Sequence, residues 1–210
     1  MLTLDHVVLA VADLEAAAER LLAEHGLTSV PGGRHPAWGT GNRIVPLGET
    51  YIELLAVVDD DVAGTNPVGR FLRRFVAGGD RWFAVSLADD ELDATAARLG
   101  LDIVTGRRER PDGVTVRWRS CGFEDEPERV SRLPFFLEWD VPAELHPGRA
   151  SVAGAQAANG IARLEMGDDG HLASWLGEDA LDHLPIAVVD GPPGLHGVVL
   201  TTSVGGELAL

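Results

Sequence analysis

The chain repeats itself, and this repeat limits the folds that it can adopt. The segment VVLAVADLEAAAERL, which begins at Val7, matches FAVSLADDELDATAARL, which begins at Phe83, with one gap inside the helical part. Near the end of each half, TYIELLAVV (50–58) likewise matches PFFLEWDVP (134–142). Self-similarity of this kind indicates repeated copies of one supersecondary unit. We therefore expect two similar modules in tandem.

Each repeat predicts a strand, then a helix, then further strands. LDHVVLAV (4–11) alternates between two faces, and Asp13 can cap a following helix that Gly26 ends. In the second half, RWFAVSLA (81–88) predicts a strand, and a capped helix is expected to end at Gly100. With about three more strands, each unit becomes a βαβββ module. The expected fold class is α+β, with the helix on one sheet face and a concave cleft on the other.

The repeat also sets the expected domain boundaries. We expect the first module, with its closing helix, over residues 1–78 and the second over 79–145. A stretch rich in Pro, Gly and Ala predicts a linker over 146–160. A weaker echo of the repeat predicts a partial third module, βαββ-like and packed on the other two, over 161–210.

The apolar pattern of the first strand predicts which side chains face the cleft. The helix must pack on the larger apolar face, which carries Val7 and Leu9, so His6 is expected to point into the cleft. By the same logic Phe83 is expected under the second helix. Trp82 then occupies the position that corresponds to His6.

Charge excludes several classes of partner. The chain has 17 basic and 33 acidic residues, a net charge of −16, so neither nucleic acid nor an anionic membrane is an expected partner. All 17 basic residues are arginine, which excludes a lysine Schiff base and a P-loop lysine.

Apolar runs and cysteine content predict where the protein is found. The apolar runs are much shorter than the ~20 residues of a membrane helix, and no export signal is visible. The single cysteine, Cys121, excludes an internal disulfide, so a cytoplasmic location is expected.

Two glutamates interrupt otherwise apolar strands. Glu53 lies inside YIELLAVV and Glu138 inside PFFLEWDV, near the end of each repeat. Burying a carboxylate is costly, so such a residue is either an exposed edge-strand residue or part of a site. Together with His6, the two glutamates could supply three ligands to a divalent ion in the cleft.

Several segments resemble a known family. LDHVVLAVADLEAA, RHPAWGTGNRIVPLG and YIELLAV are similar to the glyoxalase-like branch of the vicinal oxygen chelate superfamily, and the similarity covers at least residues 1–142. The resemblance implies paired βαβββ modules and a metal held by the first and last strands of each module. Carried across, the ligand positions are His6, Glu53 and Glu138, with Trp82 (or Phe83, for a register shifted by one) at the fourth. An aromatic side chain at that fourth position cannot bind a metal.

The polar segment 34–42 precedes a strand that would line the cleft. It is rich in polar side chains and glycines, and it contains a tryptophan. One interpretation is a ligand-binding loop that uses His35, Trp38, Thr40 and Asn42. The alternative is a structured turn in which Thr40 and Asn42 satisfy backbone groups.

Two functions remain from these observations. The first is a glyoxalase-like enzyme of the lyase, isomerase or dioxygenase type. The resemblance implies a divalent metal (Zn, Ni, Mn, Fe or Co) as Lewis acid, with Glu138 or Glu53 as base. The alternative is a metal-free protein that binds or sequesters a small molecule by stacking it on Trp82 and Trp38. Either function fits a monomer or a homodimer, because two modules in one chain can complete the cleft.

Overall fold

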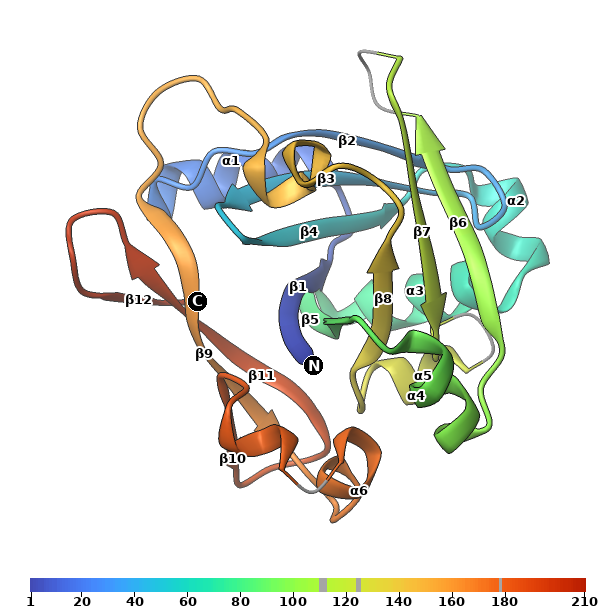
Figure 1. Ribbon diagram of the computed structural model, residues 1–210. Coiled ribbons are helices and arrows are strands. Elements are labelled where there is room, and N and C mark those ends of the chain that lie inside the picture. The colour runs from blue at the N-terminus through green and yellow to red at the C-terminus, as the bar shows by residue number, and fades with distance from the viewer. Residues whose placement is uncertain (110–112, 124–125, 178) are drawn as a thin grey trace.

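The computed structural model describes residues 1–109, 113–123, 126–177 and 179–210. These residues form an eight-stranded sheet and a separate four-stranded sheet, with short helices packed around them (Figure 1). Within these ranges, no helix is both long and apolar enough to cross a membrane. The cytoplasmic location stays a prediction.

In the first two thirds of the chain, a strand, a helix and three strands follow one another twice, and the second copy has a further short helix before its last strand. The first third contains β1 (Leu2–Ala10), α1 (Leu14–His25), β2 (Val30–His35), β3 (Thr40–Leu47), β4 (Thr50–Val57), α2 (Asp60–Thr65) and α3 (Pro67–Phe75). The second contains β5 (Arg81–Asp89), α4 (Leu92–Leu99), β6 (Ile103–Glu109), β7 (Thr115–Cys121), α5 (Pro127–Val130) and β8 (Phe135–Trp139). The last contains β9 (Ala158–Gly167), α6 (Leu172–Leu176), β10 (Ile186–Val189), β11 (Gly194–Thr202) and β12 (Glu207–Ala209).

The large sheet consists of two copies of one strand arrangement. Its order is β2-β3-β4-β1-β5-β8-β7-β6, so the first strands of the two modules lie side by side at the centre. β1 and β5 are antiparallel to each other, and each is parallel to the last strand of its own module, β4 or β8. The sheet curves until its edge strands β2 and β6 contact each other (Figure 1). The predicted α+β class with tandem βαβββ modules is confirmed.

Local sequence signals explain the two module helices. Asp13 accepts hydrogen bonds from the backbone N–H groups of Glu15 and Ala16, which caps α1, and Gly26 ends the helix at φ 66°. Gly100 ends α4 in the same left-handed conformation, at φ 67°. The N-terminal cap expected for α4 is absent, because Glu91 makes no side-chain capping hydrogen bond.

Each face of the large sheet has its own apolar cluster. On the convex face, Val7, Ile52 and Phe136 pack with α1, α4 and the second sheet. On the concave face, Leu55 packs with Leu72 of α3, which covers one end of that face. The rest of the concave face is left for a pocket.

The last third of the chain forms the second sheet, in the order β10-β9-β11-β12. It packs beside the large sheet through contacts of β9 with β3 and β4 and of β11 with β5 (Figure 1). β9 begins at Ala158, so the end of the predicted linker (146–160) belongs to this strand. Two short 3-10 helices lie at the start of the predicted linker. The first, at residues 143–145, comes just before it, and the second, at 147–149, lies inside it.

Candidate functional site

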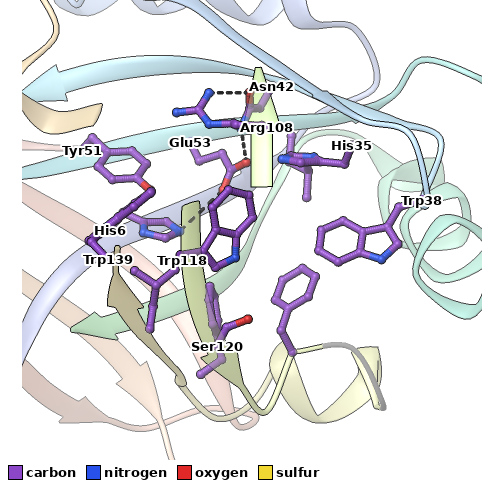
Figure 2. A pocket seen from close by; sticks show the side chains of 14 residues that line it. His6, His35, Trp38, Asn42, Tyr51, Glu53, Arg108, Trp118, Ser120 and Trp139 are labelled. Carbon is purple, nitrogen blue, oxygen red and sulfur yellow. Dashed lines mark hydrogen bonds and ion pairs between the residues drawn. The ribbon is translucent and has the colours of Figure 1, made fainter. Parts of the chain in front are cut away.

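The concave face of the large sheet holds a pocket (Figure 2). It encloses about 550 Å³ of empty space, counting its open mouth. Both modules contribute to its lining, which consists of His6, His35, Trp38, Asn42, Tyr51, Glu53, Leu55, Arg108, Trp118, Ser120, Phe123, Phe135, Leu137 and Trp139.

Strand periodicity places the β4 side chains of this pocket. Tyr51, Glu53 and Leu55 line it, whereas Ile52 and Leu54 are fully buried on the convex face. This alternation follows from the two-residue period of a strand. Glu53 therefore reaches the pocket between two bulky neighbours, with only 13% of its side chain exposed.

A bulge in β1 brings two ionisable side chains together beneath the pocket. The register between β1 and β5 shifts between Leu4 and His6, so Asp5 is the extra residue. Asp5 and His6 are both buried, at 3% exposure, and His6 Nδ1 donates to Asp5 Oδ1 at 2.5 Å. The imidazole stacks on Tyr51, with 4.4 Å between ring centres, which fixes its plane.

A continuous chain of polar contacts crosses the pocket from β6 to β1 (Figure 2). Arg108 Nη1 donates to Asn42 Oδ1 at 3.5 Å, and Asn42 Nδ2 donates to Glu53 Oε1 at 2.5 Å. Glu53 Oε2 lies 3.5 Å from His6 Nε2, and His6 continues to Asp5. The chain links the outer strand of the second module to the central strand of the first.

Two further donors close the chain behind His6. Trp139 Nε1 donates to Asp5 Oδ2 at 2.8 Å, and His146 Nε2 lies 3.1 Å from the same oxygen. His146 precedes the second short 3-10 helix, so Asp5 ties this segment to the centre of the sheet.

The pKa values of these groups are displaced in opposite directions. Burial alone lowers the pKa of His6, but the hydrogen bonds and charges of Asp5 and Glu53 outweigh burial and raise it to about 9. Burial alone raises the pKa of Glu53, but the hydrogen bond and charge of His6 lower it to about 2. Despite its burial, hydrogen bonds from His146 and His6 hold the pKa of Asp5 well below its usual range. His6 is therefore a cation between two carboxylates at neutral pH.

Aromatic rings make up most of the remaining pocket wall. Trp38 lies 5.0 Å from Phe123, and Phe123 lies 5.0 Å from Phe135, between ring centres. On the other side, Trp118 and Trp139 meet edge to face at 5.8 Å. Such a lining offers flat apolar surfaces to a ligand.

His35 and Thr40 act as a pair at the pocket wall. Thr40 is almost completely buried and is not a lining residue, and its Oγ1 lies 3.0 Å from His35 Nδ1. Burial lowers the pKa of His35. Of the four residues expected to bind ligand in segment 34–42, His35, Trp38 and Asn42 line the pocket, and Thr40 orients His35.

Trp118 depends on a glycine for its position, which yields a first prediction. A Cβ on Gly106, which pairs with Trp118 across β6 and β7, would lie 2.1 Å from Trp118 Cε2. The Gly106→Ala variant must therefore move the indole. We expect the affinity of the pocket for a neutral planar probe, 2-naphthamide, to fall about as much as in Trp118→Ala. Isothermal titration measures this affinity. Gly78→Ala is the control, because a Cβ there meets nothing within 4 Å. Unchanged affinity in Gly106→Ala would mean that Trp118 does not contact the ligand.

Glu138 does not join His6 and Glu53. Its neighbours on β8, Leu137 and Trp139, line the pocket, so Glu138 points to the other face. There its Oε2 accepts a hydrogen bond from Arg119 Nη1 at 2.7 Å. The prediction that Glu138 faces the cleft is wrong, because the pocket-facing positions of β8 are one residue before and one residue after it. The structure therefore does not bring Glu138 to the pocket as a base or a metal ligand.

Trp82 also lies outside the pocket. It lines a separate cavity on the α1 side of the sheet, with Leu9 and Leu21. The register between β1 and β5 pairs Ala84 with Val8 and Trp82 with Leu9, so the bulge leaves Phe83 as the extra residue. The predicted facing is therefore reversed: Phe83 packs in the concave cluster and Trp82 against the convex one.

The donor set does not fit the divalent metal that the family resemblance implies. His6 and Glu53 pair with each other, and His35 Nδ1 contacts Thr40. Where β8 faces the pocket it supplies Phe135 and Leu137, which cannot bind a metal. Among the described residues, no three His, Cys, Asp or Glu side chains are arranged to hold an ion.

Several residues that line the pocket are not among those predicted from the sequence. The two-residue period, applied to 50–58 and 134–142, would have found Tyr51, Leu55, Phe135, Leu137 and Trp139. The same period on β7 would have paired Trp118 with Ser120. Arg108 and Phe123 are missing from the predicted site because their positions depend on tertiary structure.

Comparisons with known proteins identify the family. The profile of a glyoxalase-like domain matches residues 4–178, and no curated protein sequence matches the chain. A hypothetical protein from Staphylococcus aureus is 17% identical, with a TM-score of 0.64 over 95% of this chain and 81% of that one. Methylmalonyl-CoA epimerase from Mycobacterium tuberculosis is 20% identical, with a TM-score of 0.46 over 66% of this chain and 88% of that one. The Streptomyces coelicolor epimerase with 2-nitronate-propionyl-CoA is 19% identical, with a TM-score of 0.46 over 66% and 94%. Because the matched profile spans most of the chain, the protein belongs to the family of glyoxalase-like domains.

Proposed function

We propose that this protein binds a small planar organic molecule in the concave pocket and that binding needs no metal ion. The observation that carries the proposal is the lining, in which six of 14 residues are Trp, Tyr or Phe. Each ring offers apolar area at little conformational cost, and stacking adds to that contact. Polar groups are gathered at the end that holds Asn42, Glu53 and His6, an arrangement that gives a ligand one orientation.

The displaced pKa values favour binding over acid–base catalysis as the role of this polar end. A catalytic acid or base works best when its pKa lies near the working pH. The pKa values of His6 and Glu53, about 9 and about 2, lie on opposite sides of neutrality and far from it. We therefore infer that the pair orients a ligand through its hydrogen bonds. The metal-dependent lyase, isomerase or dioxygenase reaction remains the alternative.

Titration with 2-naphthamide, a neutral planar probe, tests the proposed function. We expect EDTA-treated protein to bind this probe, and Trp118→Ala to weaken binding about 10-fold to 100-fold through lost stacking and apolar contact. Trp82→Ala is the matched control, because Trp82 is also half-buried but lines the cavity on the α1 side. Its affinity for the probe is expected to stay within about 2-fold of the wild type.

Metal titration separates the two candidate functions. We expect that His6 and Glu53 do not bind Zn²⁺, Ni²⁺, Mn²⁺, Co²⁺ or Fe²⁺ stoichiometrically. His6→Ala and Glu53→Ala should therefore leave the metal content of the protein unchanged. Tight binding of one of these ions, abolished in both variants and required for probe binding, would reject the metal-free function. Equal loss of probe affinity in Trp82→Ala and Trp118→Ala would reject the concave pocket as the binding site.

A further inference from the structure

Arg108 is a nearly buried cation that lines the pocket. It belongs to β6 and only 7% of its surface is exposed. Among the described residues, no carboxylate lies within ion-pair distance of its guanidinium, and one hydrogen bond is found, the 3.5 Å contact with Asn42 Oδ1. A guanidinium has five N–H groups, and buried donors without acceptors are costly. Most of this donor capacity is therefore not used by the described residues.

The surroundings of Arg108 keep it apart from the nearby carboxylate. Glu53 is engaged by Asn42 at one oxygen and by His6 at the other. Asn42 stands between Glu53 and Arg108 and contacts both. Glu53 therefore does not neutralise the guanidinium directly.

A glycine on β2 makes room for this arrangement. A Cβ at Gly32 would lie 2.1 Å from Asn42 Oδ1 and 2.9 Å from Arg108 Nη1. Any larger residue at this position would displace both groups. Gly32 thus leaves space for the guanidinium of Arg108 beside Asn42.

We propose that Arg108 binds the anionic group of the ligand, so that the pocket takes a planar aromatic carboxylate whose ring stacks on the pocket rings. This inference rests on the proposed binding function and narrows it to one class of ligand. A carboxylate accepts two parallel N–H groups from arginine, which fixes its orientation as well as its charge. Asn42 Oδ1 accepts one N–H group of the guanidinium and so helps to hold it in place.

The net charge of the chain does not oppose this proposal. The value of −16 is spread over the protein, and salt screens exposed charges beyond about 8 Å at physiological ionic strength. Only 7% of Arg108 is exposed, so salt screens an ion pair with its guanidinium much less than a pair at the surface. Local charge therefore decides which ligand binds.

A matched pair of probes tests this assignment. 2-Naphthoate and 2-naphthamide have nearly the same shape, but only the first is an anion at pH 7. We expect wild-type protein to bind the naphthoate about 10-fold to 100-fold more tightly, and Arg108→Gln to abolish this preference while the naphthamide still binds. Arg108→Lys is expected to retain part of the preference, because it keeps the charge but not the planar pair of donors. Arg107→Gln, at the exposed neighbouring position, should leave the preference unchanged.

The possible outcomes separate this inference from the proposed function. Equal affinity of the wild type for both probes, or a preference that persists in Arg108→Gln, would overturn the role of Arg108 while leaving the binding function intact. Failure of both probes to bind would overturn both. If Arg108→Gln does not fold, equal affinity of the wild type for both probes still overturns the inference, and an undiminished preference in Arg108→Lys overturns it as well.

Discussion

Replacing Asp5 with alanine is expected to lower the free energy of unfolding by about 3–5 kcal/mol. Asp5 is buried and accepts hydrogen bonds from His6 Nδ1, Trp139 Nε1 and His146 Nε2. Without this carboxylate, the buried cation keeps only Glu53 as a charged partner, and the indole N–H loses its acceptor. For a chain of this length the melting temperature should fall by about 6–20 °C. Urea or thermal denaturation measures the effect.

Asp5→Asn separates the effect of charge from that of packing, and Asp102→Ala is the control. Asp5→Asn keeps the size and one acceptor oxygen but loses the charge, so its stability should lie between those of the wild type and Asp5→Ala. By NMR titration, the pKa of His6 should fall in Asp5→Asn, because Asp5 supplies one of the two charges that raise it. Asp102→Ala, an exposed position, should stay within about 0.5 kcal/mol of the wild type. Wild-type stability in Asp5→Ala would mean that the network does not stabilise the fold.

The sequence predicts well those features that depend on near neighbours in the chain. The cap at Asp13 and the helix end at Gly26 involve only adjacent residues, and both are confirmed. The repeat predicts the paired modules because each copy carries its own strand and helix signals. His6 and Glu53 meet at 3.5 Å because each follows the period of its own strand.

Strand register explains why Glu138, Trp82 and Phe83 lie on the faces opposite to those predicted. Glu138 and Glu53 share their residue type and lie near the end of each repeat, but an ungapped comparison of 50–58 with 134–142 aligns Leu137 with Glu53. The structure agrees with that alignment, since both residues line the pocket. Trp82 was misplaced because the bulge at Phe83 reverses the alternation of β5. A bulge adds one residue without a marked change in composition, so the sequence gives little sign of it.

Contacts between distant segments could not be predicted. Arg108 belongs to a strand with a charged, weakly apolar sequence, IVTGRRE, which carries little strand signal. Its position opposite Asn42 depends on the curvature of the whole sheet, which brings β6 to β2. The contact of His146 with Asp5 spans 141 residues. Neither contact has a local signature.

Stability is also expected to decline as pH rises from 6.5 to 9, by on the order of 2–3 kcal/mol. The pKa of His6 is raised from 6.5 to about 9 on folding. A raised histidine pKa contributes stability that is fully present below pH 6.5 and is lost as pH rises through about 9. Glu53 acts in the opposite range, since its contribution is present above pH 4.5 and is lost as pH falls through about 2. The ion pair therefore contributes most between pH 4.5 and 6.5.

Composition makes the alkaline decline measurable. The chain contains no lysine, and burial raises the pKa of Cys121 to about 11. Neither lysine side chains nor this thiol therefore contribute to a change in stability between pH 6.5 and 9. Urea denaturation at pH 6.5, 7.5 and 9 should show the decline in the wild type and in His171→Gln, an exposed control. Glu53→Gln should reduce it, because Glu53 is one of the two carboxylates that raise the pKa of His6, and His6→Gln should remove it. A decline of wild-type size in His6→Gln would show that another group is responsible, and the paired state of His6 and Glu53 would then be wrong.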